Sequence, residues 1–144
     1  MRASPAHEAG QGLLAGQLQT ALEAMQMLAR FEPRLTGPLA EWTADPRLPI
    51  VLHVQADHSD DVRMYLDEQQ IPTRSMETRL HIPRSASQNL PGLGFIAGAQ
   101  EILVWIFTPA QFRQRLRVRS ESAPSQRLNL QSVRKQLESL QQQA

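Results

Sequence analysis

The sequence contains no cysteine among its 144 residues. Disulfide bonds, thiolate nucleophiles and cysteine-bound zinc or iron–sulfur sites are therefore excluded. It also lacks a long apolar run, because the longest one, residues 102–107, is far shorter than the roughly twenty residues that cross a bilayer. Residues 1–14 have neither the charged nor the apolar region of a signal peptide. These absences predict a cytoplasmic protein without a membrane contact.

Lysine and aromatic residues are scarce as well. One lysine accompanies fourteen arginines, and only seven residues are aromatic. Guanidinium groups favour planar, bidentate contacts with carboxylates and phosphates. The net charge is −5 over residues 1–72 and +6 over residues 73–144. Three interpretations stay open: the two halves pair with each other, the arginine content reflects coding bias, or the basic half presents a surface to a phosphate-bearing or acidic partner.

The spacing of apolar residues indicates a single α+β domain. Residues 1–12 have no periodic apolar face, which predicts a flexible N-terminal tail followed by one domain over residues 13–144. Helices are expected over residues 14–30, after an N-cap at Asp57 or Ser59, and after an N-cap at Asn129. Strands are expected at residues 50–54, 78–82, 93–97 and 101–107, the last two forming a hairpin across Gly98.

The stretch from Ala29 to Pro72 carries a resemblance to a known family. It reads ARFEPRLTGPLAEWTADPRLPIVLHVQADHSDDVRMYLDEQQIP, and the similarity continues through RLHI, GFIAGAQEILVWIFTP and QRLNLQSVRKQL, so that it covers roughly residues 20–140. The order of these motifs resembles small bacterial proteins of the nucleotidyltransferase superfamily. The resemblance implies an α+β fold with a mixed or antiparallel sheet and helices packed on one side.

The resemblance also implies a reaction site. In the superfamily a glycine–serine turn holds the phosphates of a nucleoside triphosphate, and an Asp-x-Asp pair on the next strand holds two magnesium ions on one strand face. Gly37 matches the turn glycine, whereas Pro38 stands at the serine position and has no backbone N–H. The carboxylate pair is expected at Pro49 and Val51, or at Val51 and His53, and none of these residues is acidic.

His53 is the one polar residue among those positions. It shares a strand face with Val51, and no second histidine or carboxylate stands at ligand spacing on that strand. This favours a half-wet sheet position or a hydrogen-bonded interior imidazole over a metal ligand.

Three functions fit the sequence. The first is a catalytically degenerate nucleotide-binding or regulatory module without the two-metal carboxylate pair. The second is an active enzyme that holds magnesium through the displaced carboxylates Asp45, Asp57 and Glu101, although Asp57 also fits a helix cap and Glu101 a solvated strand end. The third is a basic module that binds nucleic acid or an acidic protein.

The third function rests on four alternating arginines. Arg113, Arg115, Arg117 and Arg119 would lie along one side of an extended segment, and with Gly37 they are the candidate ligand-binding residues. Such a ridge suits the phosphates of a nucleotide or of a nucleic-acid backbone. It suits equally a charged edge strand that resists pairing with other sheets.

Overall fold

The structure is a computed structural model that describes residues 5–84, 87–114, 117–119, 121 and 126–143. Its elements, in chain order, are α1 (Pro5–Met27), a 3-10 turn (Ala29–Phe31), β1 (Arg34–Thr36), α2 (Gly37–Ala40), β2 (Ile50–Gln55), α3 (Ser59–Glu68), β3 (Arg74–His81), β4 (Gln88–Ala97), β5 (Gln100–Phe107), α4 (Pro109–Arg113), β6 (Arg117–Val118) and α5 (Leu130–Gln142). The predicted α+β class is confirmed. No helix in these described ranges has the length and apolar character needed to cross a membrane.

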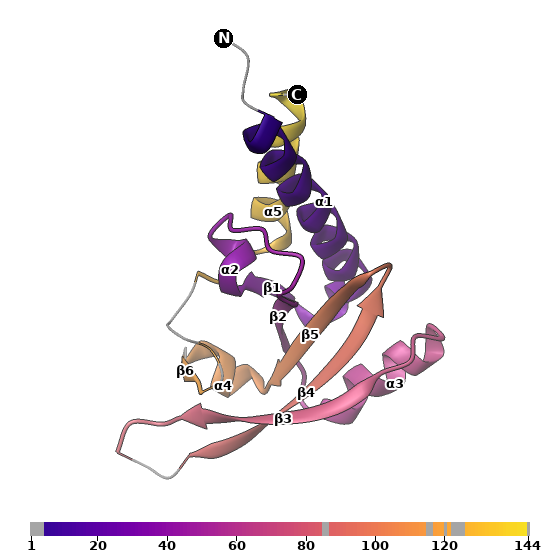
Figure 1. Cartoon of the computed structure of the whole chain (residues 1–144). Coiled ribbons are helices and arrows are strands. Elements are labelled where there is room, and N and C mark those ends of the chain that lie inside the picture. Colours follow the sequence, from indigo (N-terminus) through magenta and orange to yellow (C-terminus); the bar gives the residue numbers. More distant parts are fainter. Residues whose placement is uncertain (1–4, 85–86, 115–116, 120, 122–125, 144) are drawn as a thin grey trace.

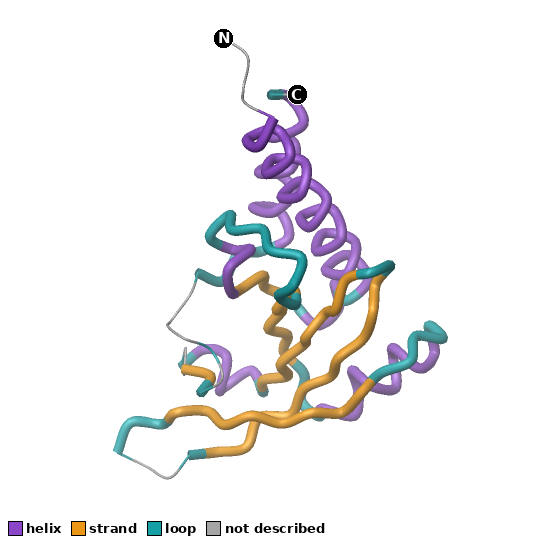
Figure 2. Tube along the Cα trace, in the orientation of Figure 1, coloured by secondary structure: helices purple, strands orange, loops and turns teal. Residues whose placement is uncertain are grey.

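All six strands form one mixed sheet in the order β1-β2-β5-β4-β3-β6. Strands β2 and β5 are parallel, and every other pair of neighbours is antiparallel. The sheet is curled, and the far end of the β3–β4 hairpin extends away from the two long helices (Figure 2). The β4–β5 hairpin turns at Gly98, whose φ of +64° lies in the left-handed region that glycine adopts readily.

The main core lies between one sheet face and the helices. Alternate side chains of β2 and β5 point into it, namely Ile50, Leu52, Val54, Ile102, Val104 and Ile106. Helices α1 and α5 run side by side in opposite directions, which brings both ends of the chain to the same end of the molecule (Figure 1). Each fully buried aliphatic side chain contributes about 1.5–3 kcal/mol, so this face supplies most of the stability.

The opposite sheet face carries a second, smaller core. Trp105 and Phe107 of β5 pack there with Leu80, Leu90 and Val118. Helix α4 covers this core, and its Phe112 ring meets the Phe107 ring edge-on at 5.9 Å. The expectation that the helices pack on one side is therefore wrong for α4.

Helix α1 begins at Pro5, so the tail predicted over residues 1–12 is helical from Pro5 onward. A Cβ added at Gly10 or Gly12 would meet nothing within 4 Å, so these turns project beyond the packed core. Once the packed turns have nucleated a helix, each further turn forms at little cost.

The two predicted N-caps have different outcomes. Asn129 caps α5, since its side chain accepts a hydrogen bond of 2.9 Å from the backbone N–H of Ser132. At α3 the N-cap is His58, and its side chain makes no capping hydrogen bond. The cap predicted at Asp57 or Ser59 is thus wrong, because α3 begins at Ser59 and the residue before it, His58, holds the N-cap position.

Candidate functional site

The turn glycine and the strand that follows it are neighbours in space. Thr36 pairs with Val51 across β1 and β2, and its hydroxyl donates to the Val51 carbonyl at 3.3 Å. Gly37 follows with a φ of +72°, and a Cβ added there would lie 3.6 Å from the Val51 Cβ. The structure therefore brings the matched glycine beside Val51, one of the positions where the resemblance expects a carboxylate. Pro38 occupies the first turn of α2, a place that suits its fixed φ.

His53 lies two residues further on the same strand face and is 3% exposed. Its Nε2 lies 2.8 Å from Glu121 Oε1, and its Nδ1 lies 3.2 Å from Arg127 Nε. A guanidinium N–H can only donate, so Nδ1 accepts and the ring proton sits on Nε2, where it is donated to Glu121. His53 is thus an interior imidazole with both nitrogens engaged.

Aromatic rings enclose this group. The His53 ring packs against the Phe107 ring at 4.7 Å. The Arg127 guanidinium lies 4.3 Å from the centre of the Phe112 ring and 5.1 Å from that of Phe107, and it donates to the Phe112 carbonyl at 2.8 Å. We call these residues, His53, Glu121, Arg127, Phe107 and Phe112, the His53 cluster. Aromatic faces attract a guanidinium, so the cluster holds Arg127 by more than its hydrogen bonds.

Burial sets the charge of His53. It lowers the pKa of the imidazole below its ordinary value, the Glu121 carboxylate raises that pKa, and the Arg127 guanidinium lowers it further. Burial is the largest of these influences because a charged ring would lose its hydration. The neutral ring that the hydrogen bonds require is therefore also the form that the surroundings favour near pH 7.

The residues present do not fit a two-metal site. Val51 offers no ligand atom, and both ring nitrogens of His53 are taken. Two guanidinium groups, Arg127 and Arg34, lie beside the Phe112 ring, and the only carboxylate in the His53 cluster is that of Glu121. Two divalent cations need several carboxylates to neutralise them. Within the described residues no group of three or more His, Asp or Glu side chains is placed to hold a metal.

The displaced carboxylates are spread over both ends of the sheet. Asp45 lies before β2 and Glu101 begins β5, at the same end of these parallel strands. Asp57 follows the other end of β2, about 20 Å away along the strand direction. The structure thus does not bring the three together, and two of them already have arginine partners.

Asp45 and Glu101 each face a guanidinium. Asp45 accepts two hydrogen bonds from the Arg47 side chain, at 3.1 and 3.0 Å, and this contact holds the pKa of Asp45 below its ordinary value. The Glu101 carboxylate lies 3.4 Å from Arg74. These are ordinary surface ion pairs of low net energy.

The arginine ridge is not one extended segment. Thr108 and Gln111 form a reciprocal capping box, and Pro109 follows the cap, so residues 109–113 form a helix and Arg113 is its last residue. Arg115 lies outside the described residues. Only Arg117 and Arg119 remain on or next to β6.

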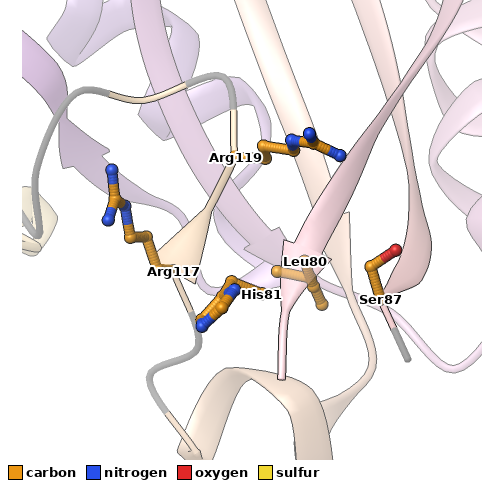
Figure 3. Close-up of a pocket in the computed structure, with 5 residues that line it drawn as sticks. All are labelled: Leu80, His81, Ser87, Arg117 and Arg119. Carbon is orange, nitrogen blue, oxygen red and sulfur yellow. The ribbon is translucent and has the colours of Figure 1, made fainter. Parts of the chain in front are cut away.

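These two arginines border a pocket at the edge of the sheet. Strand β6 pairs with β3 so that Arg117 lies opposite His81, and the Arg119 N–H donates to the Arg79 carbonyl at 2.8 Å. The pocket has a volume of about 270 Å³ and is lined by Leu80, His81, Ser87, Arg117 and Arg119 (Figure 3). We call it the β3–β6 pocket.

Comparisons with known proteins assign neither site. No model of a protein family matches the chain, and no curated protein and no solved structure matches it. Sequence reasoning also missed Glu121 and Arg127, although these are the only charged residues between residues 120 and 133. Their isolation among uncharged residues is the only local feature of the sequence that could have indicated a long-range contact such as the one with His53.

Proposed function

We propose that this chain is a nucleotidyltransferase-like protein that binds a nucleotide without transferring it, a catalytically degenerate binding or regulatory module. One observation carries the proposal. His53, at one of the positions where the resemblance expects a carboxylate, is buried with both ring nitrogens engaged by Glu121 and Arg127.

In the His53 cluster, side chains of the protein itself occupy the place where the superfamily binds metal ions. Glu121 and Arg127 hydrogen-bond to His53. The Glu121 carboxylate accepts a hydrogen bond from His53 rather than binding a metal. Opening the cluster to admit a cation would break the hydrogen bonds of the buried His53 ring, and a buried polar group left without a partner costs about 1–3 kcal/mol. Metal binding therefore fails before any chemistry begins.

Two features support nucleotide binding: the turn at Gly37 and the positive charge of the nearby arginines. Gly37 matches the glycine of the phosphate-holding turn in the resemblance, and it lies beside Val51. The second half of the chain carries the +6 net charge. Arg34 and Arg127 add positive charge at the His53 cluster, where the superfamily places carboxylates. A nucleotide without its magnesium is the ligand whose charge suits these surroundings.

Binding is tested by thermal unfolding of the purified protein with each nucleoside triphosphate, with and without magnesium. A ligand that binds only the folded state at a hundred times its Kd stabilises it by about 2.7 kcal/mol. We expect at least one nucleotide to raise the Tm equally under both conditions, and magnesium alone to leave it unchanged. A Tm that no nucleotide raises contradicts the proposal.

Transfer is tested by pyrophosphate release from labelled nucleoside triphosphates with magnesium or manganese and protein, nucleic-acid and small-molecule acceptors. We expect none. The matched variants are Asp45→Ala, Asp57→Ala and Glu101→Ala. Release by the wild type that disappears in these variants would establish the displaced-carboxylate enzyme instead.

A further inference from the structure

We infer that the β3–β6 pocket is an oligophosphate site, which holds a di- or triphosphate group through Arg117, Arg119 and Ser87. This goes beyond the proposed function, on which it rests in one respect: the ligand is a phosphorylated small molecule such as a nucleotide. The pocket is a second phosphate site at the β3–β6 edge of the sheet, separate from the Gly37 turn and the His53 cluster.

The first observation is the strand register. Leu80 lies opposite Val118, and both are buried on the second-core face. Period two then puts the side chains on either side of this pair on the opposite face, with His81 across from Arg117 and Arg79 across from Arg119. Arg79 and Arg119 are like charges across two strands, an arrangement that destabilises a sheet. An anion bound at Arg119 weakens that repulsion, so a bound phosphate stabilises this edge.

The second observation is the absence of internal partners. Arg47, Arg63 and Arg74 each form an ion pair with a nearby carboxylate. In the part of the chain that the structure describes, neither Arg117 nor Arg119 forms one. Both guanidinium groups are therefore available to an anionic ligand, without an internal ion pair that has to be broken first.

Ser87 supplies a third group at the pocket wall. Its hydroxyl oxygen accepts a hydrogen bond of 2.8 Å from Arg79, on the neighbouring strand. A hydroxyl that accepts still has its own proton to donate, so Ser87 can donate to a phosphate oxygen. Arg79 acts here as a positioning residue, because its hydrogen bond holds the Ser87 hydroxyl oxygen in place at the pocket wall.

Size and lining favour a small oligophosphate. A volume of about 270 Å³ suits a few phosphate groups, and among the described residues no Phe, Tyr or Trp lines the pocket to offer a base a large stacking surface. In Figure 3 the side chain of Arg119 points toward β3, beyond which Ser87 lies, while that of Arg117 points the other way. The bidentate geometry of guanidinium lets one phosphate chain draw them together.

The test measures binding of sodium tripolyphosphate by calorimetry without magnesium, at about 0.15 M salt so that loose ionic attraction is screened. Wild type is compared with Arg117→Gln/Arg119→Gln. A hydrogen bond to a charged group changes affinity by about tenfold or more, so the double variant should bind roughly a hundredfold more weakly. Without ligand, the same variant should have a higher Tm than wild type, since the repulsion is gone.

The matched control is Arg134→Gln/Lys135→Gln, which removes the same charge from the exposed side of α5. It should bind tripolyphosphate as the wild type does and show no rise in Tm. Equal weakening in both double variants would overturn the site, because net charge alone would explain it. Tighter binding of single-stranded nucleic acid than of tripolyphosphate would also overturn it in favour of a nucleic-acid surface.

The same variants separate this inference from the proposed function. If nucleotides stabilise wild type and Arg117→Gln/Arg119→Gln equally, the pocket is not their site and the inference fails while the proposed function stands. If tripolyphosphate binds and no nucleotide does, the pocket stands and the proposed function fails.

Discussion

The packing around Gly92 predicts a clear loss of stability when a larger residue replaces this glycine. Gly92 pairs with Trp105 across β4 and β5, and the indole lies over the glycine backbone. A Cβ at Gly92 would lie 2.3 Å from Trp105 Cε3, 2.5 Å from Cζ3 and 3.0 Å from the Val104 carbonyl oxygen. Carbon atoms in contact are normally about 3.5–4.0 Å apart, so Gly92→Ala forces the ring out of a position where only 5% of Trp105 is exposed.

The expected cost of Gly92→Ala follows from these distances. Overpacking of this kind costs about 1–3 kcal/mol. The upper limit is the loss of the whole indole, and Trp105→Ala should cost about 3–5 kcal/mol. Replacing a strand glycine by alanine restores about 0.5–1 kcal/mol of backbone entropy. We therefore expect Gly92→Ala to lower the free energy of unfolding by up to about 2.5 kcal/mol.

Gly94 provides the control two residues along the same strand. A Cβ there would lie 3.6 Å from the Arg74 side chain and 3.7 Å from Leu103, which are ordinary contacts. Gly94→Ala should be neutral or stabilising by up to about 1 kcal/mol. The assay is urea unfolding followed by far-UV circular dichroism. Equal free energies of unfolding for the two alanine variants would refute the packing argument.

Two further predictions concern His53 and the cap of α5. Burial holds the pKa of His53 below its unfolded value of about 6.5, so its contribution to stability is complete above that pH and is lost as the pH falls toward the folded pKa. Urea unfolding between pH 7.5 and 5 should show this loss, at most about 1.4 kcal/mol per pH unit, and the same pH slope in His53→Gln would contradict it. Asn129→Ala should lower the free energy of unfolding by about 0.5–2 kcal/mol, because the α5 N-cap is lost. Ser139→Ala, on the exposed side of α5, serves as its control, and equal losses in both would exclude a capping effect.

Patterns of neighbouring residues predicted the secondary structure correctly where interactions between neighbours in the sequence determine it. The alternation of apolar residues located strands β2 and β5, and Asn129 located the start of α5. The same reasoning failed where another local rule was stronger. The alternating arginines favoured a strand, but the capping box at Thr108 begins a helix that takes in Arg113.

The sequence by itself determined that no carboxylate stands at Pro49, Val51 or His53, and that cysteine chemistry is absent. These are statements about composition and strand period, which depend on neighbours along the chain. Only the tertiary structure decided what replaces the carboxylates. His53 meets partners 68 and 74 residues away, because the curled sheet and the chain after β6 bring Glu121 and Arg127 back to β2.

The charge of the β3–β6 edge was decided in the same way. The sequence shows that arginines are abundant, but the register of β3 against β6 selects which of them face one another. A shift of one residue would turn every side chain to the other face, so no count of arginines along the chain predicts the pocket. Contacts between residues far apart in the sequence, rather than residue type, therefore determine both the His53 cluster and the β3–β6 pocket.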